Sequence, residues 1–336
     1  MFYLFFGMEA NIMSISLTNV QQTEFDALVK VEYRSRGFML RDTVRLRTDI
    51  IGNTCQFRKV GQVIANQVAY QNTISIQDAT FTGYIATLLK YAAGTGVDSI
   101  EDLTVNFDTK RELALVVAMA IGRRSDQIII DAMTAATTNT NVDPTSPTPD
   151  VATGNATVDA ANNVIMTGNS NMTYSKLRNI VQYFDQDAVP VAERFVAMSG
   201  NNLRNLLNDE KIISRFYTSN DAVSDGSLNY KELLGMNVRT LPSMTEGGLP
   251  VNVGSVPTVL VNTSTSAAPL ANQSIRTCFA WHKMAVGMAI GQDMRTEVSY
   301  LPRETTWFVN GLFFAGATVV DNRGFFKIFC NESDVT

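Results

Sequence analysis

The sequence predicts an α+β protein with one long helix, an extended β excursion before it and a compact α/β region after it. Three observations support this fold class. Apolar residues recur at helical spacing from 109 to 136, whereas residues 55 to 85 alternate with a period of two. After residue 173, short helical patterns alternate with short apolar runs. A chain of 336 residues is long enough for about two domains.

The predicted helix at 109–136 is the longest in the chain. Thr109 and Glu112 have the spacing of a capping box, in which each side chain satisfies a backbone amide at the start of a helix. A helix of about 26 residues is about 40 Å long. Gly122 lies in its middle and costs about 1 kcal/mol relative to alanine, so we expect either a bend or a close backbone contact there. The apolar residues at helical spacing are Leu113, Val117, Ala120, Ile121, Ile128 and Met133.

The period-two pattern predicts a long β-hairpin or a loop of strands over residues 55–85, with turn-like points at Gly61 and at Gln71-Asn72. Arg58 and Lys59 fall close to its tip in this interpretation. Because much of the ribbon is polar on both faces, it cannot bury enough surface to be stable alone. We therefore expect it to lie on a neighbouring molecule. The preceding residues 24–50 hold no regular period for long and predict an extended arm.

The second half of the chain predicts a compact α/β region. Its expected elements, in chain order, are a helix from Thr173, a strand at 194–198, a helix at 203–207, a segment closed by Gly235, and strands near Val238 and at 259–261, 296–300, 305–320 and 324–330. By contrast, residues 137–171 are rich in Thr, Asn, Pro and Gly and lack Lys and Arg. They predict a long surface loop or insertion.

Composition excludes several classes of protein. A net charge of −5 counts against a dedicated nucleic-acid binder, whose affinity depends on excess Lys and Arg, so any DNA contact should be weak. Cys55, Cys278 and Cys330 lie far apart and indicate buried thiols in a reducing compartment. No apolar run approaches the roughly 20 residues of a membrane span, so we expect a soluble protein. Residues 1–13 make a poor signal peptide, and translation can start at Met1, Met8 or Met13.

The sequence offers no catalytic, metal-binding or cofactor-binding motif. One histidine and scattered cysteines cannot form a usual zinc site, and no glycine-rich phosphate loop or nucleophile elbow is present. The single histidine, His282, lies in an apolar segment with no carboxylate nearby before Asp293, which favours a satisfied core or interface residue over a general base. Two acidic pairs fall at predicted helix ends, where carboxylates usually cap or face solvent. They are Asp185 with Asp187 and Asp209 with Glu210.

Three segments together resemble the major capsid proteins of tailed bacteriophages. In residues 96–133, GVDSIEDLTVNFDTKRELALVVAMAIGRRSDQIIIDAM, an acidic stretch leads into a long helix with the pattern G-R-[KR]-[ST]-D-x-[LI]-I-x-A-[LM]. Residues 279–300, FAWHKMAVGMAIGQDMRTEVSY, are similar to that family's strand-turn segment with His-Lys and Ala-x-Gly. Residues 307–328, WFVNGLFFAGATVVDNRGFFKI, resemble its closing strands. The order and spacing of the three segments make the resemblance fairly specific.

The resemblance covers residues 24–330 and implies the Hong Kong 97-like capsid fold. This fold combines an N-terminal arm, an extended loop, a peripheral domain built on a long spine helix, and an axial α/β domain. The expected boundaries are 1–48 for the arm, 49–95 for the extended loop, 96–172 and 292–336 for the peripheral domain with its spine helix at 109–136, and 173–291 for the axial domain.

The resemblance implies a shell protein rather than an enzyme. Copies would assemble through hexamers and pentamers into an icosahedral shell around a double-stranded DNA genome, in the host cytoplasm and then in the virion. Scaffold, portal and decoration proteins would be further partners, DNA would be near by non-specific proximity only, and neither a cofactor nor a membrane is expected. Two alternatives stay open. They are an encapsulin-like nanocompartment shell protein and a soluble α/β enzyme.

Four basic residues are the candidates for contacts between subunits. Arg58 and Lys59 lie in the extended loop, where Lys59 matches a cross-linking position only by its place and is better explained as an interfacial lysine. Arg123 and Arg124 lie on the long helix. Charges at helical spacing usually pair, so these two arginines are expected to contact Asp126 or Asp131 or to face solvent.

Overall fold

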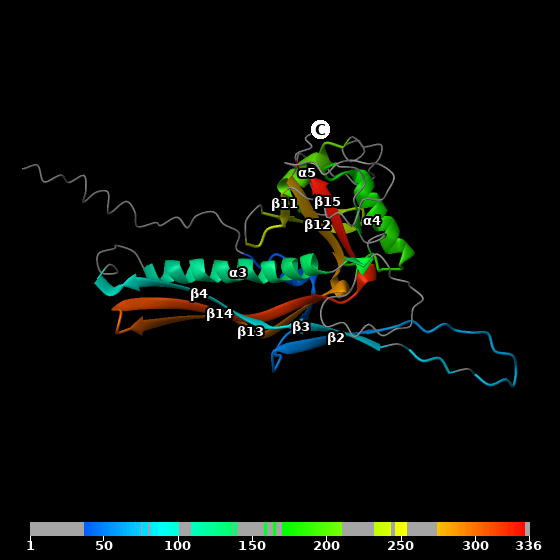
Figure 1. Ribbon diagram of the computed structural model, residues 1–336, viewed down its shortest axis with the longest axis horizontal. Helices are drawn as coiled ribbons and strands as arrows, with labels where there is room; N and C mark the ends of the chain where they lie inside the picture. The colour runs from blue at the N-terminus through cyan, green and yellow to red at the C-terminus, as the bar shows by residue number, and fades with distance from the viewer. Residues whose placement is uncertain are drawn as a thin grey trace, which may run out of the picture.

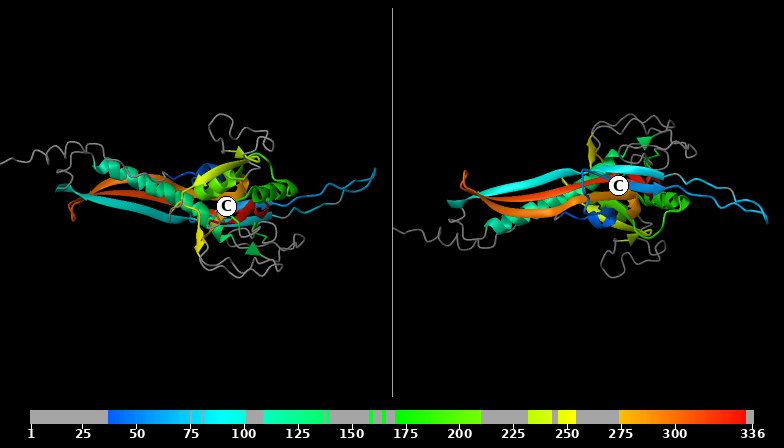
Figure 2. Two further views of the ribbon diagram at one scale, coloured as in Figure 1. Left: turned by 90° about the horizontal axis from the view of Figure 1, so that it is seen from above. Right: turned by 90° about the horizontal axis from the view of Figure 1, so that it is seen from below.

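The computed structural model describes residues 37–74, 76–79, 81–100, 109–136, 138–139, 158–159, 164–165, 170–209, 232–242, 246–253 and 274–332. Figure 1 shows an elongated unit, in which helix α3 (Thr109–Ala135) lies along a long sheet, and a compact α/β unit beside it. Strands β2 (Thr54–Val60) and β3 (Phe81–Thr87) form the base of an extended loop. The views in Figure 2 show this loop and the long sheet pointing in opposite directions.

The long sheet has four strands. Their order is β1 (Arg45–Arg47), β13 (Val286–Leu301), β14 (Thr306–Val319) and β4 (Leu89–Asp98). Helix α3 approaches β14 closely because position 311 is a glycine. A Cβ atom at Gly311 would lie 2.4 Å from Ile121 Cδ1 and 2.6 Å from Val117 Cγ1. The helix and the sheet therefore share one apolar layer, because the apolar stripe of the helix and the apolar face of the sheet must each be buried against another element.

Helix α3 confirms the predicted helix at 109–136 to within one residue. Its predicted apolar stripe is largely correct, since Val117, Ile121, Ile128 and Met133 are buried and Leu113 and Ala120 are partly buried. The close backbone contact expected at Gly122 is also present. Phe38 N donates to Gly122 O at 3.2 Å, and a Cβ atom at Gly37 would lie only 1.9 Å from Gly122 C. Gly37 has φ +74°, a conformation that favours glycine.

The compact unit is a seven-stranded sheet with helices packed on it. The strand order is β7 (Val164–Ile165), β15 (Phe325–Asn331), β12 (Ser274–His282), β8 (Arg194–Ser199), β10 (Met236–Leu241) and β9 (Glu232–Leu233), with β11 (Val251–Val253) pairing with β12. Every residue of β8 is buried, which explains the apolar run that predicted this strand. Helices α4 (Tyr174–Gln186) and α5 (Gly200–Leu207) contribute buried leucines to the same core.

Local capping and turn chemistry explain where these elements begin and end. The Thr173 side chain accepts a hydrogen bond from Lys176 N at 3.4 Å, so α4 begins where the sequence predicted it. Ser199 caps α5 in the same way. Leu234 and Gly235 both have positive φ and form the two-residue turn between β9 and β10, a geometry typical of a hairpin turn. The segment closed by Gly235 is therefore a hairpin.

Three parts of the chain lie differently from the expected boundaries. Residues 37–47 are not an extended arm, because η1 (Arg41–Thr43) and β1 pack on the body and Leu40 is fully buried. Residues 89–95 pair with β14 within β4 and not with the extended loop. Strand β15, expected with the spine helix, pairs with β12 in the compact sheet. Each segment has an apolar face that a larger sheet buries better than a ribbon does.

Two expected features fall mainly outside the described residues. They are the strand at 259–261 and most of the loop at 137–171, from which the structure describes β5 (Thr138–Asn139), β6 (Val158–Asp159) and β7. The short 3-10 helices η3 (Lys283–Ala285) and η4 (Asn322–Gly324) complete the elements used below. Within the described part of the chain, no helix combines the length and hydropathy needed to cross a bilayer.

Candidate inter-subunit surfaces

The extended loop carries large apolar side chains that its own chain does not cover. Ile74 and Ile76 are 80% and 93% exposed, although isoleucine is among the residues most often buried in folded proteins. The set that we call the loop surface consists of Val63, Ile64, Val68, Tyr70, Ile74, Ile76 and Phe81. A concentration of exposed apolar groups on one segment marks an interaction site.

The tip of this loop is at residues 70–72, where Asn72 N donates to Ala69 O at 3.2 Å. The Gln71-Asn72 turn is therefore confirmed. The sequence placed Arg58 and Lys59 near the tip, and this prediction is wrong. Both residues lie in β2 at the base of the loop. The error arose because Gly61 has the character of a turn residue, whereas the chain runs on past it to the turn at residues 70–72 (Figure 1).

Lys59 has a partner within its own chain. Its Nζ lies 2.6 Å from Asp321 Oδ1, at the start of η4, and both side chains are partly buried. This ion pair joins the base of the extended loop to the compact unit. Arg58, the adjacent residue, is exposed on the opposite side of β2.

Arg123 and Arg124 are partly buried on α3. The guanidinium of Arg124 lies over the Tyr91 ring at 4.6 Å from its centroid, a cation-π contact between α3 and β4. The expected pairing with Asp126 or Asp131 is absent from the ion pairs of the described residues, and the expected alternative, exposure to solvent, holds only in part because both arginines are partly buried. The Asp131 carboxylate accepts from Gln127 Nε2 at 2.6 Å.

Asp126 was missed as a key residue by the sequence reasoning. It is 1% exposed, and its carboxylate accepts hydrogen bonds from Met39 N at 3.1 Å and Leu40 N at 3.0 Å. Burial raises the pKa of Asp126 from 3.8 to about 6, against the lowering effect of these two amides. The sequence signal for a buried Asp126 was its position on the apolar stripe of α3, four residues after Gly122. The residue fixes the segment that precedes β1 to the middle of the long helix.

Two ion pairs fix the same segment to both units. Arg41 makes a bidentate pair with Asp293 of β13, with N–O distances of 3.0 and 2.6 Å. Asp42 pairs with Arg239 of β10 at 2.7 Å. Residues 37–47 therefore bridge the long sheet and the compact unit.

His282 lies at the end of β12 and is 8% exposed. Its Nδ1 accepts a hydrogen bond from Met284 N at 3.2 Å, and burial lowers the pKa of the imidazole. These contacts agree with the predicted satisfied histidine. Two members of the acidic pairs also have structural partners: Asp185 pairs with Arg194 at 2.8 Å, and Asp209 accepts from Tyr174 N at 3.3 Å.

The remaining chemistry-bearing groups are also placed. Cys55, Cys278 and Cys330 are free and buried, as the composition indicated. In the part of the chain that the structure describes, His, Cys, Asp and Glu residues do not gather into a group of three suited to a metal ion. Glu210 lies outside the described residues.

Comparison with known proteins was made on both sequence and fold. A family model described as phage capsid protein matches residues 17–332. The search of curated proteins found no match. The fold is similar to the head structure of Helicobacter pylori bacteriophage KHP40, with a TM-score of 0.67 and 10% identity over 98% of this chain and 100% of that chain.

Two further capsid structures are similar to the whole chain. The capsid of Ralstonia phage GP4 has a TM-score of 0.65 and 12% identity, covering 92% of this chain and 95% of that one. The capsid of cyanophage P-SCSP1u has a TM-score of 0.62 and 14% identity, covering 90% of both chains. At such low identities these likenesses show the Hong Kong 97-like fold, whereas the family model covers nearly the full sequence. The chain belongs to the phage capsid protein family and is a major capsid protein, a structural component of the virion shell.

Proposed function

We propose that copies of this chain assemble into hexamers and pentamers by placing the extended loop of one subunit across its neighbour. The observation that carries this proposal is the loop surface defined above. Its side chains are exposed in the single chain, and the two-stranded base of the loop has too small a core to be stable alone. Closed symmetric assembly would bury the same surface on every subunit.

The proposed contact accounts for two further features. The Lys59–Asp321 ion pair and the Arg41–Asp293 pair fix the base of the loop and the segment before β1 to the body. A loop held at its base has fewer conformations before association, which lowers the entropy lost on association. Helix α3, with Gly122 in close contact with residues 37–38, forms a stiff support for the contact.

The proposal extends to the particle. We infer that shells form in the host cytoplasm and enclose double-stranded DNA, with scaffold, portal and decoration proteins as partners. The net charge of −5 supports non-specific proximity to DNA, because a strongly attractive inner wall would oppose packing and release. Membership of a structural family supports a role without catalysis.

The test replaces two apolar loop residues and leaves the fold unchanged. In the double variant Ile74→Ser/Ile76→Ser, shells or capsomers should be lost while the melting temperature of the unassembled subunit stays the same. Full burial of an isoleucine is worth about 1.5–3 kcal/mol, so two residues remove about 3–6 kcal/mol from each subunit contact. Assembly is measured by electron microscopy and sedimentation.

A matched control uses polar residues of the same loop. Gln62 and Gln67 are exposed there, so Gln62→Ser/Gln67→Ser should assemble like the wild type. Equal shell yields from the isoleucine variant and the control would remove the loop from the subunit contact.

A further inference from the structure

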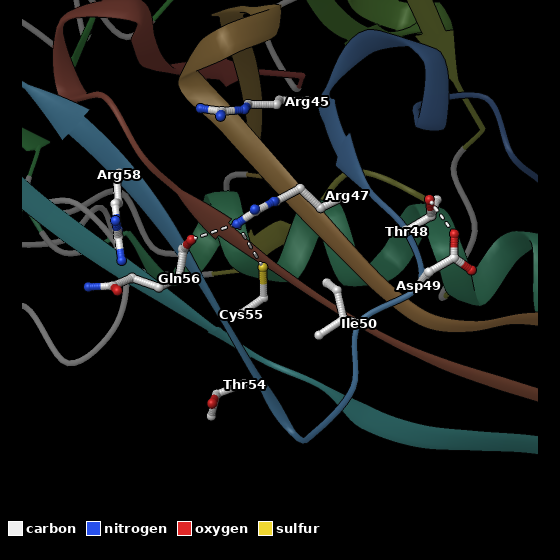
Figure 3. Close-up of a pocket in the computed structure, with 9 residues that line it drawn as sticks. All are labelled: Arg45, Arg47, Thr48, Asp49, Ile50, Thr54, Cys55, Gln56 and Arg58. Carbon is white, nitrogen blue, oxygen red and sulfur yellow. Dashed lines mark hydrogen bonds between the residues drawn. The ribbon is translucent and has the colours of Figure 1, made fainter.

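A basic pocket lies at the base of the extended loop, between β1 and β2. Its volume is about 580 Å³. Figure 3 shows Arg45 and Arg47 on the β1 side, Arg58 on β2, and Asp49 at the opposite end of the pocket. The sequence does not link Arg45 with Arg58, because 13 positions separate them and only the fold brings them to one pocket.

The positive charge of this pocket is not balanced within the described residues. Arg47 Nη1 donates to Gln56 O at 3.0 Å, which leaves its charge without a carboxylate. Arg45 lies over the Phe57 ring at 5.8 Å. Among the residues that the structure describes, neither Arg45 nor Arg58 forms an ion pair. The one carboxylate, Asp49, accepts from Thr48 Oγ1 at 3.2 Å. Three guanidinium groups therefore face one acid.

Guanidinium groups bind carboxylates and phosphates with paired hydrogen bonds. Two observations favour a carboxylate. Asp49 lines the same pocket and would repel the repeated charges of a nucleic-acid backbone, whereas a single side chain can approach the arginines from the other end. In addition, the chain has 32 acidic residues and a net charge of −5, so each copy offers carboxylates to its neighbours.

The position of the pocket indicates which molecule supplies the carboxylate. Strand β2 forms one wall and leads directly into the loop surface, so a neighbour that covers the loop also reaches the pocket. We propose that this pocket receives an Asp or Glu side chain from a second copy of the chain in the shell. The inference rests on the subunit contact proposed above and adds a specific electrostatic site to it.

Charge reversal in the assembled particle tests the site. Arg58 is exposed in the single chain, so R58E should leave the melting temperature of the unassembled subunit unchanged and lower shell yield at least tenfold. R58K keeps the charge and should assemble. D49N changes the same pocket with the opposite sign, and asparagine tolerates the positive φ of Asp49, so its shell yield should equal or exceed that of the wild type.

Cross-linking identifies the origin of the carboxylate. Shells of the R58K variant, assembled from a mixture of ¹⁵N-labelled and unlabelled subunits, are treated with a carbodiimide, which joins amines to carboxylates. Mass spectrometry should find the new amine at position 58 joined to an Asp or Glu of a subunit with the other label. The neighbouring Lys59 should be joined to Asp321 of its own chain, which serves as an internal control.

Three results would overturn the proposal. The first is normal assembly of R58E, and the second is that cross-links from position 58 stay within one chain. The third is that R58E shells assemble normally but lose DNA, a result that would assign the pocket to phosphate. Each is read against wild-type shells. Failure of the wild type itself to form shells would instead refute the proposed function.

Discussion

Removal of the Asp126 carboxylate should release the segment before β1 from the long helix. The carboxylate is the acceptor for two buried backbone amides, those of Met39 and Leu40. Each buried amide left without a partner costs about 1–3 kcal/mol. Asp126→Ala should therefore lower the free energy of unfolding by about 2–6 kcal/mol. Asp126→Asn keeps one oxygen for one amide and should cost about half as much at pH 7.

The pH dependence provides an independent check on the same residue. Because burial raises the pKa of Asp126 above its unfolded value, the corresponding stability is fully present below about pH 3.8 and is lost as the pH rises through about 6. A pKa raised from 3.8 to about 6 corresponds to about 3 kcal/mol. The unfolded carboxyl is already about half ionised at pH 4, so the difference in unfolding free energy between wild type and Asp126→Asn should decrease by about 2 kcal/mol from pH 4 to pH 7.

The assay is urea denaturation of unassembled subunits at several pH values, followed by tryptophan fluorescence. Trp281 is a suitable probe, since it is buried and its Nε1 donates to Thr43 O at 3.0 Å, just beyond the segment that Asp126 holds. A constant difference between wild type and Asp126→Asn from pH 4 to pH 7 would refute the assigned pKa. Unchanged stability of Asp126→Ala would refute the anchoring role.

Two further substitutions, one of them with a matched control, test the packing of the fold. Gly37→Ala should lower the melting temperature by several degrees, because Gly37 has a positive φ and the added Cβ atom would lie 1.9 Å from Gly122 C. The control is Gly200→Ala at the start of α5, where the added Cβ meets open space, so this variant should be neutral or slightly stabilising. Equal effects of the two variants would contradict the close contact. Glu332→Gln should destabilise the subunit by about 3–5 kcal/mol, since the nearly buried Arg276 loses the carboxylate that lies 2.6 Å from its Nε. A change below 1 kcal/mol in chemical denaturation would show that solvent compensates the charge of Arg276.

The sequence was most informative where one local rule decided the structure. The apolar period of α3, the Thr173 cap and the alternation of β14 depend on neighbours within a few residues, so they could be predicted. Gly122 was identified as a site of close contact for the same reason. The contacting partner, Gly37, was not identified, because 85 positions separate the two glycines in the chain.

Long-range pairings limited the rest of the prediction. Strand β15 joins the compact sheet, and β4 joins the long sheet, through registers that no local pattern specifies. The same limitation affected the candidate contacts. Lys59 proved to pair with Asp321, 262 positions away, and the basic pocket around Arg58 depends on β1 lying beside β2. Charge and residue type indicated contact residues, but only the fold shows which of them lie together.

The most direct measurement is negative-stain electron microscopy, with light scattering for mass, on the chain expressed alone and together with its neighbouring genes. A shell protein whose subunits contact through the extended loop should give closed shells tens of nanometres across, or free hexamers and pentamers. A monodisperse monomer or dimer under both conditions would contradict assembly through the loop.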